Sequence, residues 1–285
     1  MEQTSIQKFI PLDKSWINRM GILDIVNGRD DIQKFLAEQS NLGDDLIALK
    51  RCAENWSTGG VIDVGESGTL YRLLKFASWK LGLKKEFRTQ GTLSHRKVTD
   101  DPGIVNLSQA ELLKLDNGTS QWATAKVLLG DTERLPNPPY KLARTYEAVD
   151  HWQQQRAQNL MWVPKYDETI SGQAQAFEKM LQGERPNFVP AQAEDFCFAY
   201  IFGYITAEEG EQRWPALRYH ESDRIVEVQE MHERTKNGEP VTSHDHRVVQ
   251  AIAMWAKLNS HEVKFTHPEA VNKSWVQFWD FLKKE

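Results

Sequence analysis

The 285-residue sequence has little of what marks several classes of protein. It has two cysteines, Cys52 and Cys197, without metal-ligand spacing, which argues against a disulfide framework or a structural zinc site and favours a reducing compartment. It has no basic excess: the net charge of -5 argues against a general nucleic-acid-binding protein. No apolar run approaches the ~18 residues of a membrane span, and the first residues lack an apolar signal core. We therefore expect a cytoplasmic protein that binds neither nucleic acid nor a membrane.

What the sequence does contain is a recurring alternation of short apolar segments, polar turns and amphipathic helices. The clearest case predicts a strand over residues 61–64, a turn over 65–68 and a helix over 70–77, where apolar residues recur at helical spacing. Similar segments are found at residues 116–130, 189–205 and 243–258. This alternation predicts an α/β fold in which helices pack on sheets.

Eight polar turns follow one another along the chain, and each is a weak signal by itself. They are DKSWINR (13–19), GESGTLYR (65–72), SHRKV (94–98), GTSQ (118–121), NPPY (137–140), HESDRI (220–225), HDHR (244–247) and NKSWVQFWDFL (272–282). Helix N-termini attract anions, so several such turns aimed at one cleft could hold anionic ligands. In this order the turns resemble the motifs of the enolpyruvyl transferases, most closely the branch that acts on shikimate 3-phosphate.

The resemblance implies a two-domain inside-out α/β barrel of repeated βαβαββ units. The chain is shorter than usual members of the family, which implies that about one unit is missing, mainly between Tyr140 and Asp195. We expect residues 20–150 to form one domain, and residues 1–19, including a strand that carries Lys14, to join residues 151–285 in the other. The active-site cleft would then lie between the domains.

The resemblance also implies a reaction, in which the enolpyruvyl group of phosphoenolpyruvate is transferred to the 5-hydroxyl of shikimate 3-phosphate and phosphate is released. It implies a monomer without a metal or other cofactor. The residues assigned to phosphoenolpyruvate are Lys14, Gly68, Arg96, Gln121, Arg224, Arg247 and Lys273. Those assigned to the acceptor, a phosphorylated cyclic polyol acid, are Lys14, Ser15, Arg19, Thr69, Thr119, Ser120, Gln121, Tyr140 and His220. Arginine suits this task because its planar fork pairs with carboxylate and phosphate groups.

Proton transfer is the second requirement of this reaction, and the candidate catalytic residues are Lys14, Glu221 and Asp195. A carboxylate beside cations can carry the protons that the acceptor hydroxyl loses and the methylene carbon gains. Glu221 occupies the glutamate position of the family. A small shift of the alignment places Asp195 at its second carboxylate, and a helix-start role for Asp195 remains open. Residues 221–223 also have the composition of a helix cap, and for Asp223 we expect mainly that structural role.

Three substitutions depart from the family pattern: Glu66 replaces an asparagine, Asn137 a serine and His220 a lysine. A carboxylate at Glu66 would repel phosphoenolpyruvate unless Arg72 or Arg96 neutralises it. These changes leave open a carboxyvinyl transferase with a different acceptor.

The missing unit leaves open a non-catalytic paralogue that binds anions. The nucleotide-sugar branch of the family is disfavoured, because its reactive cysteine lies on a mobile loop, whereas Cys52 and Cys197 lie in helical patterns. For His246 we expect a role in holding its own loop.

Overall fold

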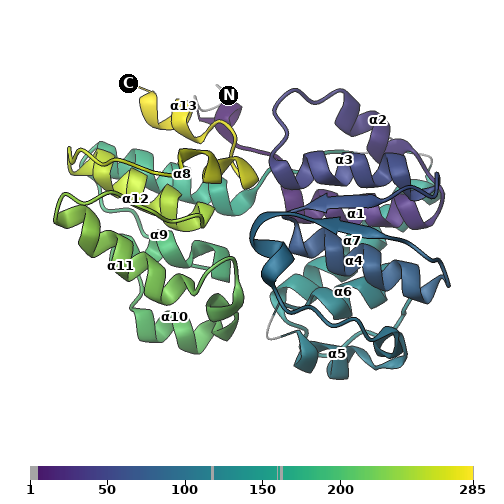
Figure 1. The fold of residues 1–285 in the computed structure, drawn as a ribbon. Coiled ribbons are helices and arrows are strands. Elements are labelled where there is room, and N and C mark those ends of the chain that lie inside the picture. The colour runs from purple at the N-terminus through teal and green to yellow at the C-terminus, as the bar shows by residue number, and fades with distance from the viewer. Residues whose placement is uncertain (1–5, 117–118, 159, 161–162, 285) are drawn as a thin grey trace. The chain divides into compact units, whose positions relative to one another are not determined.

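The computed structural model describes residues 6–116, 119–158, 160 and 163–284. The chain forms two compact units (Figure 1), which we call the N-terminal unit (Leu12–Lys165) and the C-terminal unit (Met1–Pro11 with Tyr166–Glu285). Helices dominate both, and one small parallel sheet makes the fold mixed α/β. Among the helices described, none has the length and apolar character that crossing a membrane requires.

The units differ in their bounds from the expected domains, because residues 12–19 and 151–165 belong to the N-terminal unit. Lys14 is the first residue of helix α1 (Lys14–Val26). Asp13 caps this helix by accepting a hydrogen bond from the Trp16 backbone N–H at 2.9 Å. The prediction of a strand at Lys14 is therefore wrong, because the side chain before it starts a helix.

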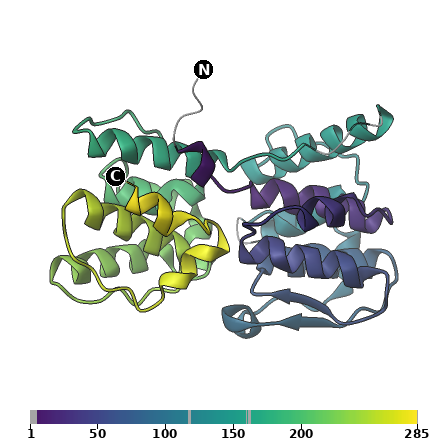
Figure 2. The same ribbon diagram turned by 90° about the horizontal axis from the view of Figure 1, so that it is seen from above.

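The N-terminal unit packs its helices around one two-stranded sheet. The helices are α1, α2 (Asp31–Ala37), α3 (Asp44–Trp56), α4 (Gly68–Lys80), α5 (Gln109–Leu115), α6 (Gln121–Leu128) and α7 (Tyr140–Ala157), with 3-10 helices η2 (Gly91–His95) and η3 (Pro102–Asn106). Strands β1 (Ile62–Gly65) and β2 (Phe87–Thr89) pair in parallel. Figure 2 shows the sheet beside the helices of this unit, where β1 contacts α3 and α4. The contacts of β1 with α3 and with α4 hold the turn that joins β1 to α4.

The C-terminal unit is helical, apart from an isolated bridge between Val241 and Phe265 in its described residues. Its helices are α8 (Glu168–Leu181), α9 (Phe196–Ile201), α10 (Ala207–Arg213), α11 (Arg224–Lys236), α12 (His246–Leu258) and α13 (Phe278–Lys283), with 3-10 helices η1 (Gln7–Phe9), η4 (Ala193–Asp195), η5 (Pro215–Tyr219) and η6 (Pro268–Lys273). The N-terminal residues join this unit partly through the Trp275 indole, which donates to the Phe9 carbonyl at 2.6 Å.

The predicted strand–turn–helix alternation holds fully at one of four places. The strand, turn and helix around residues 61–77 are confirmed by β1 and α4. Helices α6, α9 and α12 begin after polar turns as predicted, but the described residues before them form no strand. Side chains occupy the backbone donors there: Ser243 accepts from the Asp245 N–H, which removes one donor from strand pairing. The mixed α/β class stands, and an inside-out barrel is not shown.

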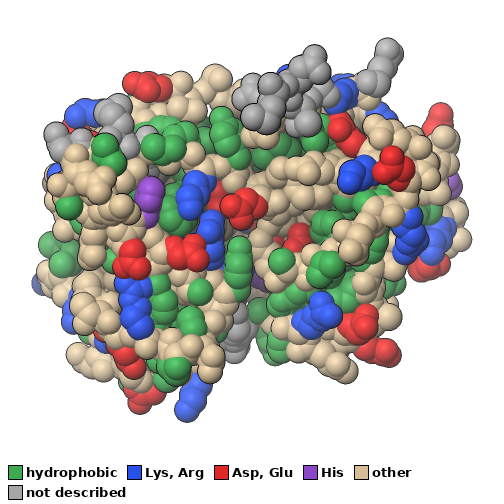
Figure 3. Space-filling model, turned by 180° about the vertical axis from the view of Figure 1, so that it is seen from behind, with side chains coloured by type: hydrophobic (Ala, Val, Ile, Leu, Met, Phe, Trp, Pro, Cys, Tyr) green, Lys and Arg blue, Asp and Glu red, His purple; other side chains and the backbone are tan. Residues whose placement is uncertain are grey.

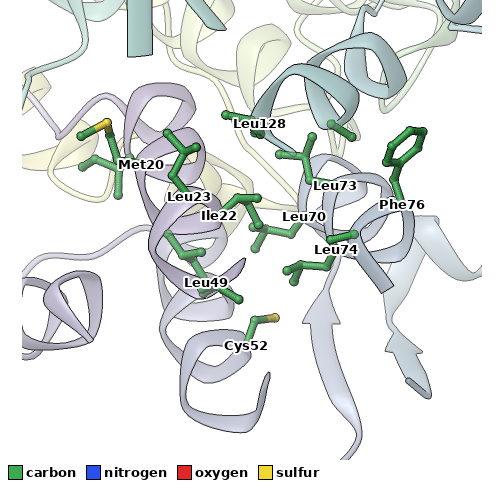
Figure 4. Packing of buried hydrophobic residues seen from close by; sticks show 14 of the residues in the cluster. Met20, Ile22, Leu23, Leu49, Cys52, Leu70, Leu73, Leu74, Phe76 and Leu128 are labelled. Atoms are coloured by element: carbon green, nitrogen blue, oxygen red, sulfur yellow. The ribbon is translucent and has the colours of Figure 1, made fainter. Parts of the chain in front are cut away.

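The N-terminal unit has an apolar core of its own. Figure 4 shows Ile22, Leu49 and Leu70, from α1, α3 and α4, extending into the same interior. Gly21 permits the close approach of α1 to α3, since a Cβ at this position would lie 2.8 Å from Leu49 Cδ2. A larger residue there would push the two helices apart.

Each cysteine lies in the core of a different unit: Cys52 in the N-terminal unit and Cys197 in the C-terminal unit. Burial raises the pKa of Cys52 to about 12 and also raises that of Cys197. Both thiols therefore stay protonated at neutral pH and act as small apolar core groups.

A buried carboxylate joins α1 to α2 and α7. Asp24 is 0% exposed and accepts hydrogen bonds from Trp152 Nε1 (2.8 Å), Arg156 Nη2 (3.1 Å) and the Ile32 N–H (3.1 Å). Burial raises the pKa of Asp24, and the Trp152 bond and the charge of Arg156 offset part of this rise. Removing the carboxylate would take this acceptor from the buried Ile32 N–H and from the half-buried Trp152 and Arg156, of which Arg156 would keep Asp31 as a partner.

We therefore expect Asp24→Ala to lower the free energy of unfolding by about 3 kcal/mol, the typical cost of breaking one side of a buried charged network. The matched control is Asp30→Ala, which removes an exposed carboxylate paired with Lys34 at 2.9 Å and should change it by less than about 1 kcal/mol. Urea denaturation followed by circular dichroism measures both. Equal losses in the two variants would show that the Asp24 network does not hold the helices together.

Candidate functional site

The starts of α11 and α12 gather charged side chains in the C-terminal unit. We call the group formed by Glu221, Arg224, Asp245, His246 and Lys273 the Glu221 cluster. Arg224 Nε donates to Asp245 Oδ2 at 2.7 Å, and the two residues are 3% and 1% exposed. Glu221 uses its oxygens separately: Oε1 lies 2.8 Å from Lys273 Nζ and Oε2 lies 3.1 Å from His246 Nδ1. The cluster thus joins three segments that are distant in the sequence.

The cap of α11 is Asp223 and not Glu221. Asp223 accepts from the backbone N–H groups of Ile225 and Val226, each at 3.2 Å, as expected for its structural role. Glu221 is therefore not needed to cap the helix. Its carboxylate is left for the contacts with His246 and Lys273.

The charges around Glu221 set its protonation state. Burial by itself would raise the pKa of Glu221, but the charges of His246, Lys273 and Arg224 lower it well below its usual range. Burial likewise opposes ionisation of Asp245, and the charge of Arg224 lowers its pKa below the usual range. Both carboxylates are therefore ionised at neutral pH.

His246 is the residue that reasoning from the sequence missed. It begins α12 and is buried, and its Nδ1 meets the Glu221 carboxylate. The signal available in the sequence was the run of three polar residues, Asp245–Arg247, at a helix start, because side chains on one helical turn lie close together. The contact with Glu221 makes His246 part of the cluster, beyond the role in holding its own loop that we expected.

Arg247, the second residue of α12, is buried with 4% exposure. Among the described residues, its Nε and Nη1 have no hydrogen-bond partner, and no acid forms an ion pair with it. Buried guanidinium groups are normally paired, because removing an unpaired charge from water is costly. Arg247 is thus a buried cation whose Nε and Nη1 donors have no acceptor within the described part of the chain.

Asp195 is bound to its own turn. Its carboxylate accepts from Gln173 Nε2 (3.0 Å) and from the N–H groups of Ala191 (2.9 Å) and Gln192 (3.2 Å). Burial raises its pKa, and these bonds and the charge of Arg247 lower it in part. The contacts support the helix-start role, while a role for Asp195 as a base stays a prediction.

A second group of predicted site residues meets at the start of α4 in the N-terminal unit. Arg72 Nη1 donates to Gln121 Oε1 at 2.8 Å and to the Gly68 carbonyl at 3.2 Å. Gln121 Nε2 donates to Thr69 Oγ1 at 3.1 Å. A Cβ at Gly68 would lie 3.1 Å from Arg72 Nη1 and 3.6 Å from Arg96 Nη1, so both arginines reach this turn. The structure therefore joins the GESG, SHR and TSQ motifs.

Glu66 forms no ion pair with Arg72 or Arg96 in the described structure. Its side chain lies over Gly91, where a Cβ would overlap the carboxylate and where φ is +50°. Within the described structure neither Arg72 nor Arg96 forms an ion pair with it, and Arg96 donates instead to Thr92 Oγ1 at 2.8 Å. Neither of the two arginines considered as partners therefore neutralises Glu66, because the turn places its carboxylate next to Gly91.

Arg19 is turned into the protein. Its Nε donates to Thr145 Oγ1 (2.8 Å), its Nη1 to the Ser15 carbonyl (2.7 Å) and its Nη2 to the Lys141 carbonyl (2.9 Å). These bonds tie α1 to α7. They give Arg19 a structural role and occupy the donors assigned to the acceptor.

The other predicted residues are spread over both units. Lys14 pairs with Asp45 at 2.9 Å, Ser15 is exposed, and Tyr140 is an exposed residue at the start of α7. His220 is half-buried after η5 in the C-terminal unit. Lys14 and Lys273 belong to different units, and their joint action on one ligand stays a prediction.

The turn that carries Thr119, Ser120 and Gln121 depends on Asp116. The Asp116 carboxylate accepts from the Trp122 N–H at 2.9 Å and from Thr119 Oγ1 at 3.3 Å. Ser120 has a left-handed φ of 58° at the start of α6. Burial raises the pKa of Asp116 to about 6 despite these bonds.

Glu221, Asp245 and His246 could also be considered as metal ligands, because their ligand atoms lie within 4.8 Å of one another. Lys273 and Arg224 already pair with the two carboxylates, however. Two cations at these oxygens would repel a metal ion, so the arrangement favours an ion-pair cluster.

Comparison with known proteins provides no relative: the chain matches no protein-family model, no curated protein and no solved structure.

The pKa of Asp116 yields a test of how the TSQ turn is held. Its folded-state value of about 6 lies above the ordinary 3.8, so protonation stabilises the fold as the pH falls below about 6. From about pH 7.5 to about pH 4.5, wild type should gain about 2 kcal/mol relative to Asp116→Asn, which cannot titrate. Urea denaturation at both pH values measures the difference. A difference independent of pH would show that Asp116 is not buried as described.

Proposed function

We propose that this protein is an enolpyruvyl transferase that converts phosphoenolpyruvate and shikimate 3-phosphate, as a 3-phosphoshikimate 1-carboxyvinyltransferase. The observation that carries the proposal is Arg247, a buried guanidinium with unpartnered donors, next in sequence to the His246 that contacts Glu221. The reaction requires this combination, an anion-binding cation beside a proton-carrying pair. On this proposal the chain is a reduced form of the inside-out barrel, which keeps the ligand-binding turns and has lost most strands of the βαβαββ units.

The binding step uses the charge of phosphoenolpyruvate. Its carboxylate and phosphate are anionic, and a guanidinium in a dry site forms strong charge-assisted hydrogen bonds with either group. Arg247 supplies these donors, while Arg224 and Lys273 are balanced by Asp245 and Glu221. The anion thus satisfies a charge that the fold leaves without an acid partner among its described residues.

The chemical step moves protons around the transferred group. The acceptor hydroxyl loses a proton as its oxygen attacks C2 of phosphoenolpyruvate, and the methylene carbon gains one. The tetrahedral intermediate then loses phosphate, and its new methyl group gives up a proton, which restores the C=C double bond in the product. Glu221 is ionised and can accept a proton, and His246 Nδ1 at 3.1 Å gives that proton a second site.

A different acceptor is the second candidate. Thr69, Thr119 and Gln121 offer hydroxyl and amide groups suited to a polyol, but each nitrogen of Arg19 already donates to Thr145 or to a backbone carbonyl. Loss of this cation from the acceptor side favours an acceptor with fewer anionic groups than shikimate 3-phosphate. A phosphate-release assay with phosphoenolpyruvate and a panel of acceptors separates these candidates, and a binding-only paralogue would release no phosphate with any of them.

Arg247→Met should weaken phosphoenolpyruvate binding by roughly a hundredfold, because a buried charge-assisted contact is worth about 2–3 kcal/mol. It should not lower thermal stability, since it removes an unpaired buried charge. Isothermal titration calorimetry and thermal unfolding measure the two effects. The control is Arg218→Met, which removes an exposed guanidinium paired with Glu211 and Asp223 and should leave binding unchanged. Wild-type binding by Arg247→Met would exclude this residue as the anion site.

Glu221→Gln should leave phosphoenolpyruvate binding nearly intact and lower the rate of phosphate release by about 10²–10⁴, the usual contribution of a general acid or base. Glutamine keeps the shape and a hydrogen-bond acceptor for Lys273 but cannot take up a proton. Glu230→Gln, at an exposed position on α11, is the matched control and should behave as wild type. Normal turnover by Glu221→Gln would leave the residue a purely structural role.

A further inference from the structure

The N-terminal unit has a hollow that the proposed reaction does not use. Its volume is about 650 Å³, within the ~300–1,000 Å³ typical of small-molecule sites. It lies between one face of α4 and the segment that leads from α4 into β2. Its lining includes Tyr71, Lys75, Trp79, Lys84, Lys85 and Phe87. None of these residues belongs to the Glu221 cluster or to the Gly68–Arg72–Gln121 network.

Aromatic rings form the apolar walls of this hollow. Tyr71 and Phe87 meet edge to face, with ring centroids 5.7 Å apart and an interplanar angle of 88°. Trp79 is backed by Trp122, at 6.0 Å and 22°, so its ring is supported from within the core. Tyr71 and Trp79 are two turns apart on α4 and therefore share a face. Lys75 Nζ lies 4.8 Å from the centroid of the Tyr71 ring and 5.3 Å from that of Trp79, so a planar ligand would contact the ring surface that Lys75 leaves uncovered.

Lysines provide the charge of the hollow. Lys75 is committed to the protein: its Nζ donates to the Tyr71 hydroxyl at 2.6 Å and pairs with Asp100. Lys85 donates to the Trp56 carbonyl. Lys84 is exposed, and the described residues provide it with no hydrogen bond or ion pair. It is the cation of the hollow most available to a ligand.

We propose that this hollow binds a planar aromatic anion, a flat ring that carries one carboxylate or phosphate group. The ring packs against Trp79 and Phe87, and the acidic group pairs with Lys84. Asp100 balances Lys75, so Lys84 and Lys85 against one acid, Glu86, leave the lining positive. A small molecule fits better than a nucleic acid, because the chain is acidic and Figure 3 shows basic and acidic side chains interspersed on one face.

The first experiment is isothermal titration calorimetry of the full chain with probes that separate ring from charge. Indole-3-acetate and adenosine monophosphate carry both features, indole and adenosine carry the ring alone, and acetate and inorganic phosphate carry the charge alone. At least one aromatic anion should bind about tenfold or more tightly than both of its partial counterparts. If indole-3-acetate binds more tightly than adenosine monophosphate, the recognised group is a carboxylate, and the reverse order identifies a phosphate. Equal affinity for the whole and partial probes would overturn the proposal.

The second experiment places the binding in this hollow. Lys84→Gln should weaken the aromatic anion about tenfold and leave the neutral ring unaffected, while Lys80→Gln, an exposed lysine of α4 outside the hollow, should change neither. Trp79→Leu should weaken both ligands, with thermal unfolding as the check that it folds. Arg247→Met should bind the aromatic anion normally, which separates this site from the proposed reaction. Wild-type affinity in both Lys84→Gln and Trp79→Leu, or loss in Arg247→Met, would place the ligand elsewhere and refute the proposal.

Discussion

The buried ion pair between Arg224 and Asp245 determines the geometry of the charged groups in the C-terminal unit. Both residues are almost fully removed from solvent, so either one without the other would be a buried unpaired charge that costs several kcal/mol. The pair connects the start of α11 to the start of α12. It thereby fixes where Glu221, which precedes α11, lies relative to His246 and Arg247, which begin α12. While this ion pair is intact, Glu221, His246 and Arg247 keep their relative positions.

The cations of the same region differ in how they are balanced by acids. Arg224 is matched by Asp245 and Lys273 by Glu221, while no acid of the described residues pairs with Arg247. The charge of Arg247 acts instead on the buried Asp195, where it offsets part of the rise in pKa without forming an ion pair. Because these side chains are buried, water screens their charges less than it would at the surface.

The sequence predicted the features that depend on neighbours along the chain. Helix α4 and the Asp223 cap follow from spacing and side-chain chemistry within a few residues. The number of strands was not predictable in this way, because strand pairing depends on partners far along the chain, and the polar turns satisfied their backbone donors locally instead. The direction in which long side chains point could not be predicted either, because it also depends on residues far along the chain. Arg19 points into the protein because it donates a hydrogen bond to Thr145 on α7. His246 contacts Glu221, which lies 25 positions earlier in the sequence.

The positions of the two cysteines allow local opening of each unit to be measured by thiol labelling. Each unit contains one thiol, Cys52 in α3 and Cys197 in α9, and each is shielded by its own apolar core. A thiol-specific reagent can react only when the surrounding helices separate, so the labelling rate at each position measures how often that unit opens. The two rates, resolved by peptide mass, would show whether the units unfold together or one at a time. No engineered probe is needed for such a measurement.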